Sequence, residues 1–180
     1  AFANLTIIDT LEIINNPLLS TISGFNNLSI VSEQLFISGG SIQFETNLFS
    51  SLESIGGDLS IFNTANTEEL NSFNNLSIIG GNLNLTDLNY STINGFNSLV
   101  AIGEDLGLSG GSFQSISGFE ILNSIGDELF IGNTTGLQNI NSFDSLTSIG
   151  GNFSIFENPI LNSIREFPLL KNIGGTLTIS

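Results

Sequence analysis

The chain has 180 residues, 40% of them hydrophobic, and carries 17 acidic but only two basic residues, which gives a formal charge of −15 at pH 7. This charge argues against binding to nucleic acid or to anionic lipid, because both depend on surfaces rich in lysine and arginine. The absence of cysteine excludes a disulfide framework and a thiolate metal site. No apolar run reaches the roughly 18 residues that would predict a membrane-spanning helix.

A phenylalanine recurs every 23 or 24 residues and marks a repeated unit. In each unit a leucine follows three residues later, and isoleucine or valine follows three residues after the leucine. The eight marker phenylalanines are Phe2, Phe25, Phe49, Phe73, Phe96, Phe119, Phe143 and Phe167. Such a period is typical of solenoids, in which each unit buries its apolar residues only against its neighbours. We therefore expect one repeat domain over residues 1–180. Because neither end shows a polar cap, we expect this domain to be part of a longer or processed chain.

Each unit then continues into a short segment in which two apolar residues flank one other residue, as in Leu59 and Ile61 or Phe153 and Ile155. This alternation predicts a strand with one buried face. The three-residue spacing before it does not match the 3.6-residue period of an α-helix, so the chain should be nearly helix-free. The predicted fold is an all-β parallel β-solenoid of eight rungs, about 35 Å long at about 4.8 Å per rung.

Glycine pairs follow the third apolar position in four units, at Gly56-Gly57, Gly80-Gly81, Gly150-Gly151 and Gly174-Gly175. Glycine at a corner predicts either a positive φ angle or a close approach of two backbone segments. A nucleotide-binding loop is disfavoured, because neither the helix nor the lysine that accompanies such loops is present.

Two stretches carry a family resemblance: SFNNLSIIGGNLNL from Ser72 to Leu85, and SFDSLTSIGGNFSIFENPIL from Ser142 to Leu161. They resemble the receptor L domain, the leucine-rich β-helix of the ectodomains of insulin- and epidermal-growth-factor-type receptors. They are closer still to the cysteine-free repeat arrays of bacterial surface proteins, especially from marine Bacteroidetes. The resemblance covers nearly the whole chain and implies a right-handed solenoid with a broad parallel sheet, located outside the cell and used for binding. The cysteine-rich neighbours of the metazoan members are missing, which disfavours a hormone receptor.

Four phenylalanines fall at strand positions that alternation turns away from the core: Phe36, Phe62, Phe130 and Phe156. They form two pairs, each on adjacent rungs. Contiguous apolar side chains on a surface mark contact sites, so these four residues are the predicted ligand-binding residues. The alternative is that a neighbouring domain or other side chains of this chain cover them.

Four acidic residues recur at one corner of two adjacent rungs: Glu104, Asp105, Asp127 and Glu128, here called the acidic corner. Carboxylates this close repel one another unless they are solvated, protonated or bridged by a hard cation, and calcium is the predicted cation. The alternative is a solvated corner without metal, because the loops lack the spaced ligand series of a calcium-binding loop.

Histidine and cysteine are both absent, which removes the usual general base and the thiol nucleophile, so we predict that the chain is not an enzyme. We predict a recognition or adhesion module, secreted or on the cell surface, that binds a glycan or a protein through the outward face of its parallel sheet. The alternative is a structural rod or filament subunit that associates end to end with other copies of itself.

Overall fold

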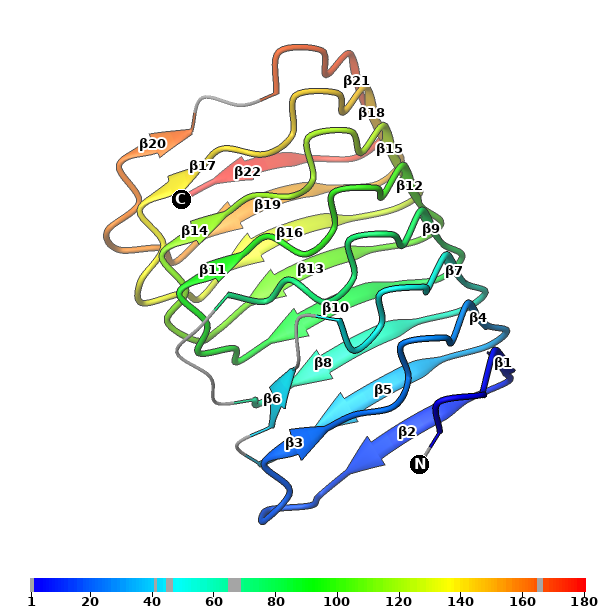
Figure 1. The fold of residues 1–180 in the computed structure, drawn as a ribbon. Coiled ribbons are helices and arrows are strands. Elements are labelled where there is room, and N and C mark those ends of the chain that lie inside the picture. Colours follow the sequence, from blue (N-terminus) through cyan, green and yellow to red (C-terminus); the bar gives the residue numbers. More distant parts are fainter. Residues whose placement is uncertain (1, 41, 45–46, 65–68, 165–166) are drawn as a thin grey trace.

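The computed structural model describes residues 2–40, 42–44, 47–64, 69–164 and 167–180. These residues form strands and turns, and no helix occurs among them. The chain winds through about seven turns of a parallel β-solenoid and advances along one axis, so its two ends lie at opposite ends of the stack (Figure 1). The predicted all-β parallel solenoid is confirmed. Its right-handedness and the number of eight complete rungs stay predictions.

The longest strands form one sheet, here called the wide sheet, in which each strand pairs in parallel with the equivalent strand of the next turn. Leucine, isoleucine or phenylalanine occupies the first and third positions of each strand, and from Leu35 through Ile155 these residues are buried in the core, as the alternation predicts. The order of the strands is β2 (Leu11–Ile14), β5 (Leu35–Ser38), β8 (Leu59–Phe62), β10 (Leu83–Thr86), β13 (Leu106–Ser109), β16 (Leu129–Gly132), β19 (Phe153–Phe156) and β22 (Leu177–Ile179).

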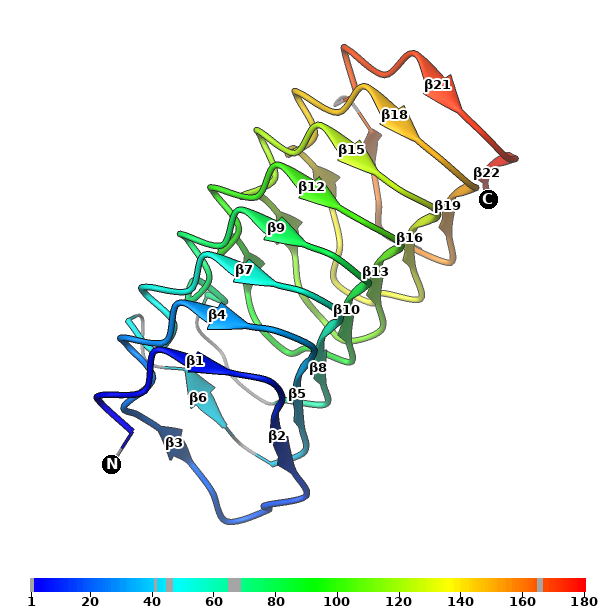
Figure 2. The same ribbon diagram turned by 90° about the vertical axis from the view of Figure 1, so that its right-hand side faces the viewer.

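A second parallel sheet, the narrow sheet, is built from the two-residue strands that precede each strand of the wide sheet (Figure 2). Its strands carry the isoleucine or valine of the three-residue pattern, and these residues point into the core from Val31 onward through Ile149. The order of the strands is β1 (Ile7–Ile8), β4 (Ile30–Val31), β7 (Ser54–Ile55), β9 (Ile78–Ile79), β12 (Ala101–Ile102), β15 (Ser124–Ile125), β18 (Ser148–Ile149) and β21 (Asn172–Ile173).

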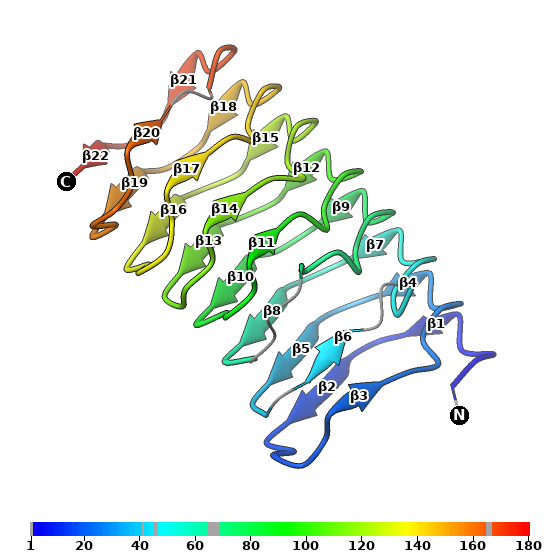
Figure 3. The same cartoon turned by 60° about the vertical axis from the view of Figure 1, so that its left-hand side comes forward.

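The third face of the solenoid is less regular, because its strands fall into two separate sheets (Figure 3). One contains β11 (Thr92–Ile93), β14 (Ser115–Ile116), β17 (Asn139–Ile140) and β20 (Ser163–Ile164), and the other contains β3 (Thr21–Ile22) and β6 (Gln43–Phe44). An isolated bridge between Leu70 and Ile93 extends the first sheet by one residue. The segment that joins the wide sheet to the next marker phenylalanine is therefore the variable part of each turn.

The marker phenylalanines form a continuous column through the core. Each ring stacks on the ring of the next turn, with centroids 5.0 to 6.0 Å apart and ring planes within 27° of each other. Offset-stacked pairs of this kind contribute about 0.5 to 1.5 kcal/mol beyond the area they bury. Phe96 is fully buried between two rings, whereas Phe2, with one neighbouring ring, is 53% exposed.

The corner glycines are required by close approach and not by positive φ. A Cβ on Gly103 would lie 2.8 Å from the carbonyl carbon of Gly80, and closer still to its oxygen. The same clash recurs at Gly80, Gly126 and Gly150 with the equivalent residue of the preceding turn. None of these glycines has a positive φ. Consecutive turns therefore touch backbone to backbone at this corner, which leaves no room for a side chain.

A different position adopts positive φ. The residue directly after the wide-sheet strand has a φ between 51° and 79° in seven turns: Asn15, Gly39, Asn63, Asp87, Gly110, Asn133 and Glu157. Glycine, asparagine and aspartate tolerate this left-handed conformation, which ends the strand and turns the chain toward the third face. Glu157 is the one member of the set that carries a longer side chain.

Candidate ligand-recognition face

The outward surface of the wide sheet, here called the wide face, consists of the second and fourth residues of its strands. Neighbouring strands pair in register, so these residues form two columns that run along the solenoid. The first column is Glu12, Phe36, Ser60, Asn84, Gly107, Phe130, Ser154 and Thr178. The second is Ile14, Ser38, Phe62, Thr86, Ser109, Gly132 and Phe156.

The structure brings the predicted aromatic residues together in two pairs. Phe36 of β5 lies diagonally from Phe62 of β8, with ring centroids 5.5 Å apart and ring planes inclined by 33°. Phe130 of β16 lies diagonally from Phe156 of β19, with centroids 4.9 Å apart and an edge-to-face angle of 68°. Both pairs thus use the first column on one strand and the second column on the next.

All four rings are half-buried, because each packs against its partner and against the backbone of the sheet. Ser60 is buried beside the first pair. Gly132 is buried under the second pair, where an added Cβ would lie 3.1 Å from the ring of Phe130. The sheet itself therefore positions each pair, and the rings turn away from the core while remaining partly exposed.

Small or polar residues occupy the two strands between the pairs: Asn84 and Thr86 on β10, and Gly107 and Ser109 on β13. The hydroxyl oxygens of Thr86 and Ser109 lie 3.2 Å apart and share a hydrogen bond. These residues are smaller than phenylalanine, so no large side chain lies on the two strands between the aromatic pairs.

The residues of the acidic corner lie on two adjacent turns, as predicted, and take part in a ladder of hydrogen bonds. The backbone N–H of Asp105 donates to Oδ1 of Asn82 (3.0 Å), and the backbone N–H of Glu128 donates to Oδ1 of Asp105 (2.8 Å). Asn82 also donates from its amide nitrogen to Oε2 of Glu104 (3.1 Å). Oε1 of Glu128 accepts a hydrogen bond from Oγ of Ser154 (3.2 Å), while Asp127 is exposed.

These hydrogen bonds give three of the four carboxylates a role in holding successive turns together. Within the described ranges, no three acidic, histidine or cysteine side chains are grouped closely enough to hold a metal ion. Calcium at the acidic corner therefore stays a prediction.

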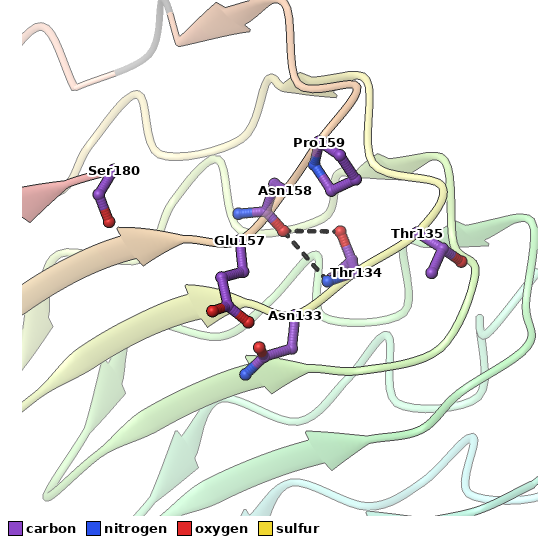
Figure 4. Close-up of a pocket in the computed structure, with 7 residues that line it drawn as sticks. All are labelled: Asn133, Thr134, Thr135, Glu157, Asn158, Pro159 and Ser180. Carbon is purple, nitrogen blue, oxygen red and sulfur yellow. Dashed lines mark hydrogen bonds between the residues drawn. The ribbon is translucent and has the colours of Figure 1, made fainter.

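A hollow of about 620 Å³ lies where β16 and β19 end, next to Phe156. It is lined by Asn133, Thr134, Thr135, Glu157, Asn158, Pro159 and Ser180 (Figure 4). Oδ1 of Asn158 accepts hydrogen bonds from the hydroxyl (2.7 Å) and the backbone N–H (3.3 Å) of Thr134, which fixes the floor. The side chains of Glu157 and Asn133 lie next to each other in this hollow, and Glu157 places a carboxylate in it.

The structure also exposes apolar residues that the sequence analysis missed. Ile30 of β4 and Ile78 of β9 point outward from the narrow sheet and are 36% and 48% exposed. Serine occupies the same position on β7, β15 and β18. The sequence did carry a signal for them: these two units have two consecutive apolar residues where other units have serine followed by isoleucine. These residues give the narrow sheet an apolar surface of its own in its N-terminal half.

Comparison with known proteins identifies the class of repeat. Residues 29–94, which run from β4 to β11, match the family model described as Receptor L domain. No curated protein and no solved structure matches the chain. Together with the parallel solenoid, the match shows that the chain carries a receptor L-domain-like repeat. The nearer resemblance to bacterial surface arrays stays a prediction.

The family match points to a coarse class of function. Receptor L domains are non-enzymatic ligand-binding units, extracellular in receptors, and their ligands are typically proteins. The match therefore suggests that this chain is a recognition module. Among its described residues there is no helix with the length and hydrophobicity needed to cross a membrane.

Proposed function

We propose that this chain is a secreted or cell-surface adhesion module that binds a glycan or a protein through the wide face. The observation that supports this proposal most directly is the placement of two aromatic pairs on a sheet face whose other outward residues, apart from Ile14, are small or polar. Aromatic residues are enriched at the centres of binding interfaces because they bury a large area and lose little conformational freedom.

The proposal is tested by replacing one ring of each pair in the double variant Phe36→Ser/Phe130→Ser. Serine already stands at the same strand position on β8 and β19, so the sheet accommodates it. Each half-buried ring contributes about 1 kcal/mol to stability, so the variant should remain folded at 25 °C. Attachment to an array of oligosaccharides and extracellular-matrix proteins should fall at least about tenfold, which corresponds to about 1.4 kcal/mol.

The matched control is the double variant Ile30→Ser/Ile78→Ser, which removes a comparable apolar area from the narrow sheet. Serine also stands at the equivalent position there, on β7. If the wide face binds the ligand, the control should attach like the parent chain. Equal attachment of the parent and of Phe36→Ser/Phe130→Ser would show that the wide face is not the binding site. Loss of attachment in the control alone would assign it to the narrow sheet.

A second proposed function is end-to-end association into a rod. In such a rod Phe2 and Leu177, which lie on the first and last turns and are 53% and 52% exposed, would each pack against the neighbouring copy. Phe2 belongs to the phenylalanine column and Leu177 to a strand of the wide sheet, so a second copy at either end would continue both. Sedimentation velocity over a range of concentrations tests this: a concentration-dependent series of larger species supports the rod, and a monomer at every concentration rules it out for this chain.

A further inference from the structure

The two aromatic pairs have a fixed separation. Phe36 and Phe130 occupy the same column on strands that are four steps apart, through β8, β10 and β13. At about 4.8 Å per step the equivalent rings are about 19 Å apart. An extended polypeptide rises about 3.3 Å per residue, so residues roughly six positions apart span this distance and point to the same side. The spacing therefore fits an extended peptide that lies along the solenoid.

The geometry of the rings favours side chains over sugars as the groups that contact them. A pyranose packs on an aromatic residue by laying its flat C–H face on the flat face of the ring. The second pair meets edge to face at 68° and the first is tilted by 33°, so neither pair offers two coplanar faces. A branched aliphatic or aromatic side chain can fill the angle between two such rings.

Charge at both edges of the wide face favours a basic ligand. Asp58, Asp105 and Glu128 directly precede β8, β13 and β16, and the exposed residues Asp87 and Glu157 directly follow β10 and β19. Lys171, the one basic residue in the described ranges, precedes β21 of the narrow sheet. A ligand on the wide face thus meets negative charge at both ends of the strands, and steering of a basic partner follows from this field.

The hollow beside the second pair supplies a specific position for one basic side chain. Glu157 carries the one formal side-chain charge among its lining residues, and Pro159 contributes an apolar side chain. The long alkyl stem of lysine or arginine packs on such a lining while its charged head reaches a carboxylate. A basic residue next to an apolar anchor on Phe130 and Phe156 fits this arrangement.

From these observations we infer that the ligand of the wide face is a polypeptide segment with two apolar side chains about 19 Å apart and lysine or arginine around them. This inference rests on the proposed function, because it names the ligand of the same face. The aromatic pairs hold the apolar side chains, and Asp87 and Glu157 contribute the charge that selects the basic residues.

The experiment uses defined probes in fluorescence anisotropy. The first is a labelled peptide of about twelve residues with two leucines roughly six positions apart, lysines around them, and serine and glycine elsewhere. In the second probe glutamate replaces every lysine, and in the third the two leucines are adjacent. Cellohexaose, a neutral oligosaccharide, is added as a competitor and is measured separately by calorimetry. The first peptide should bind at least about tenfold more tightly than either altered peptide.

Two pairs of charge variants separate local from global electrostatics. Asp87→Asn/Glu157→Gln removes two charges at the edge of the wide face, whereas Glu53→Gln/Asp144→Asn removes two exposed charges elsewhere. The edge variant should weaken binding of the first peptide at least about threefold, and the control should change it little. Raising the ionic strength from about 0.05 to about 0.3 M should weaken binding by the parent chain, because screening shortens the reach of the edge charges.

The outcomes distinguish the ligand class from the proposed site. Tighter binding of the first peptide that is lost in Phe36→Ser/Phe130→Ser and reduced in the edge variant supports the inference. Binding of cellohexaose that depends on the same phenylalanines overturns the ligand class and keeps the site. Peptide binding that is unchanged in Phe36→Ser/Phe130→Ser overturns both. Failure of all probes to bind, or equal binding of the lysine and glutamate peptides, overturns the inferred ligand.

Discussion

Replacement of Gly103 by alanine should separate two turns of the solenoid. The new Cβ would lie 2.8 Å from the carbonyl carbon of Gly80, whereas carbon atoms in ordinary contact are about 3.5 to 4.0 Å apart. The turns must therefore move apart by about 1 Å, because the obstructing atoms belong to the backbone and cannot rotate away. This movement strains the hydrogen bonds that join these two turns, from Gly103 N–H to Ile79 O (2.9 Å) and from Glu104 N–H to Gly81 O (3.1 Å).

The expected loss of stability follows from these contacts. Overpacking of this kind costs about 1 to 3 kcal/mol, and each weakened backbone hydrogen bond contributes up to about 1 kcal/mol, so the unfolding free energy should fall by about 3 kcal/mol. For a chain of this size the melting temperature should then fall by about 6 to 12 °C. Circular dichroism melts of the parent and variant measure this change.

Gly107→Ala is the matched control. It lies in the wide sheet four residues later, where an added Cβ would meet only the side-chain Oδ1 of Asn84 at 2.9 Å, and that side chain can turn. The change in stability should stay within about 1 kcal/mol, since alanine also removes the entropic cost of glycine in a strand. Close approach would be refuted as the reason for the glycine if the Gly103→Ala chain melted within about 2 °C of the parent. It would also be refuted if Gly103→Ala lost no more stability than Gly107→Ala.

Three further predictions concern the core, the turns and the acidic corner. In urea titrations, Phe96→Ala should lower the unfolding free energy by about 3 to 5 kcal/mol and Phe2→Ala by far less, because of the two only Phe96 is fully buried between two rings. Equal losses in the two variants would contradict the stacked column. Glu157→Asn should raise the melting temperature by about 2 to 4 °C, because asparagine tolerates the φ of 52° better; a lower melting temperature would contradict a strained turn. If the acidic corner binds calcium, a tenfold excess over the dissociation constant should stabilise the chain by about 1.4 kcal/mol, reversed by chelator; unchanged melting would exclude the site.

The skeleton of the solenoid was predictable because every repeated position has one structural role. The marker phenylalanine, the leucine and the isoleucine recur at the same spacing. Residues at equivalent positions of successive units therefore stack into one column in the core. The third face was not predictable in the same way. Its segments vary in length and residue type, and the strands β3 and β6 form a sheet separate from the one that begins at β11.

Two features were left open or missed because they depend on backbone geometry. The glycine pairs allowed both positive φ and close approach, and only the separation of successive turns decides between them. The left-handed column after the wide sheet had a sequence signal, since asparagine, aspartate or glycine occupies six of its seven positions. Glu157 breaks that pattern. The number of residues between this position and the next marker phenylalanine also varies, which makes the equivalent positions hard to align in the sequence. The half-burial of the four outward rings also depends on packing between strands, which alternation alone does not describe.

The repeat explains why the candidate site can be specific without a deep pocket. Because each strand pairs in register with the next, the outward columns are straight, and the distance between two chosen side chains is a whole number of steps of about 4.8 Å. Phe36 with Phe62 and Phe130 with Phe156 use the same diagonal placement, four strands apart. Substitutions at outward positions change what the face presents and leave the inward columns intact. If the wide face binds a ligand as proposed, recognition is set by which steps carry aromatic residues and which edges carry charge.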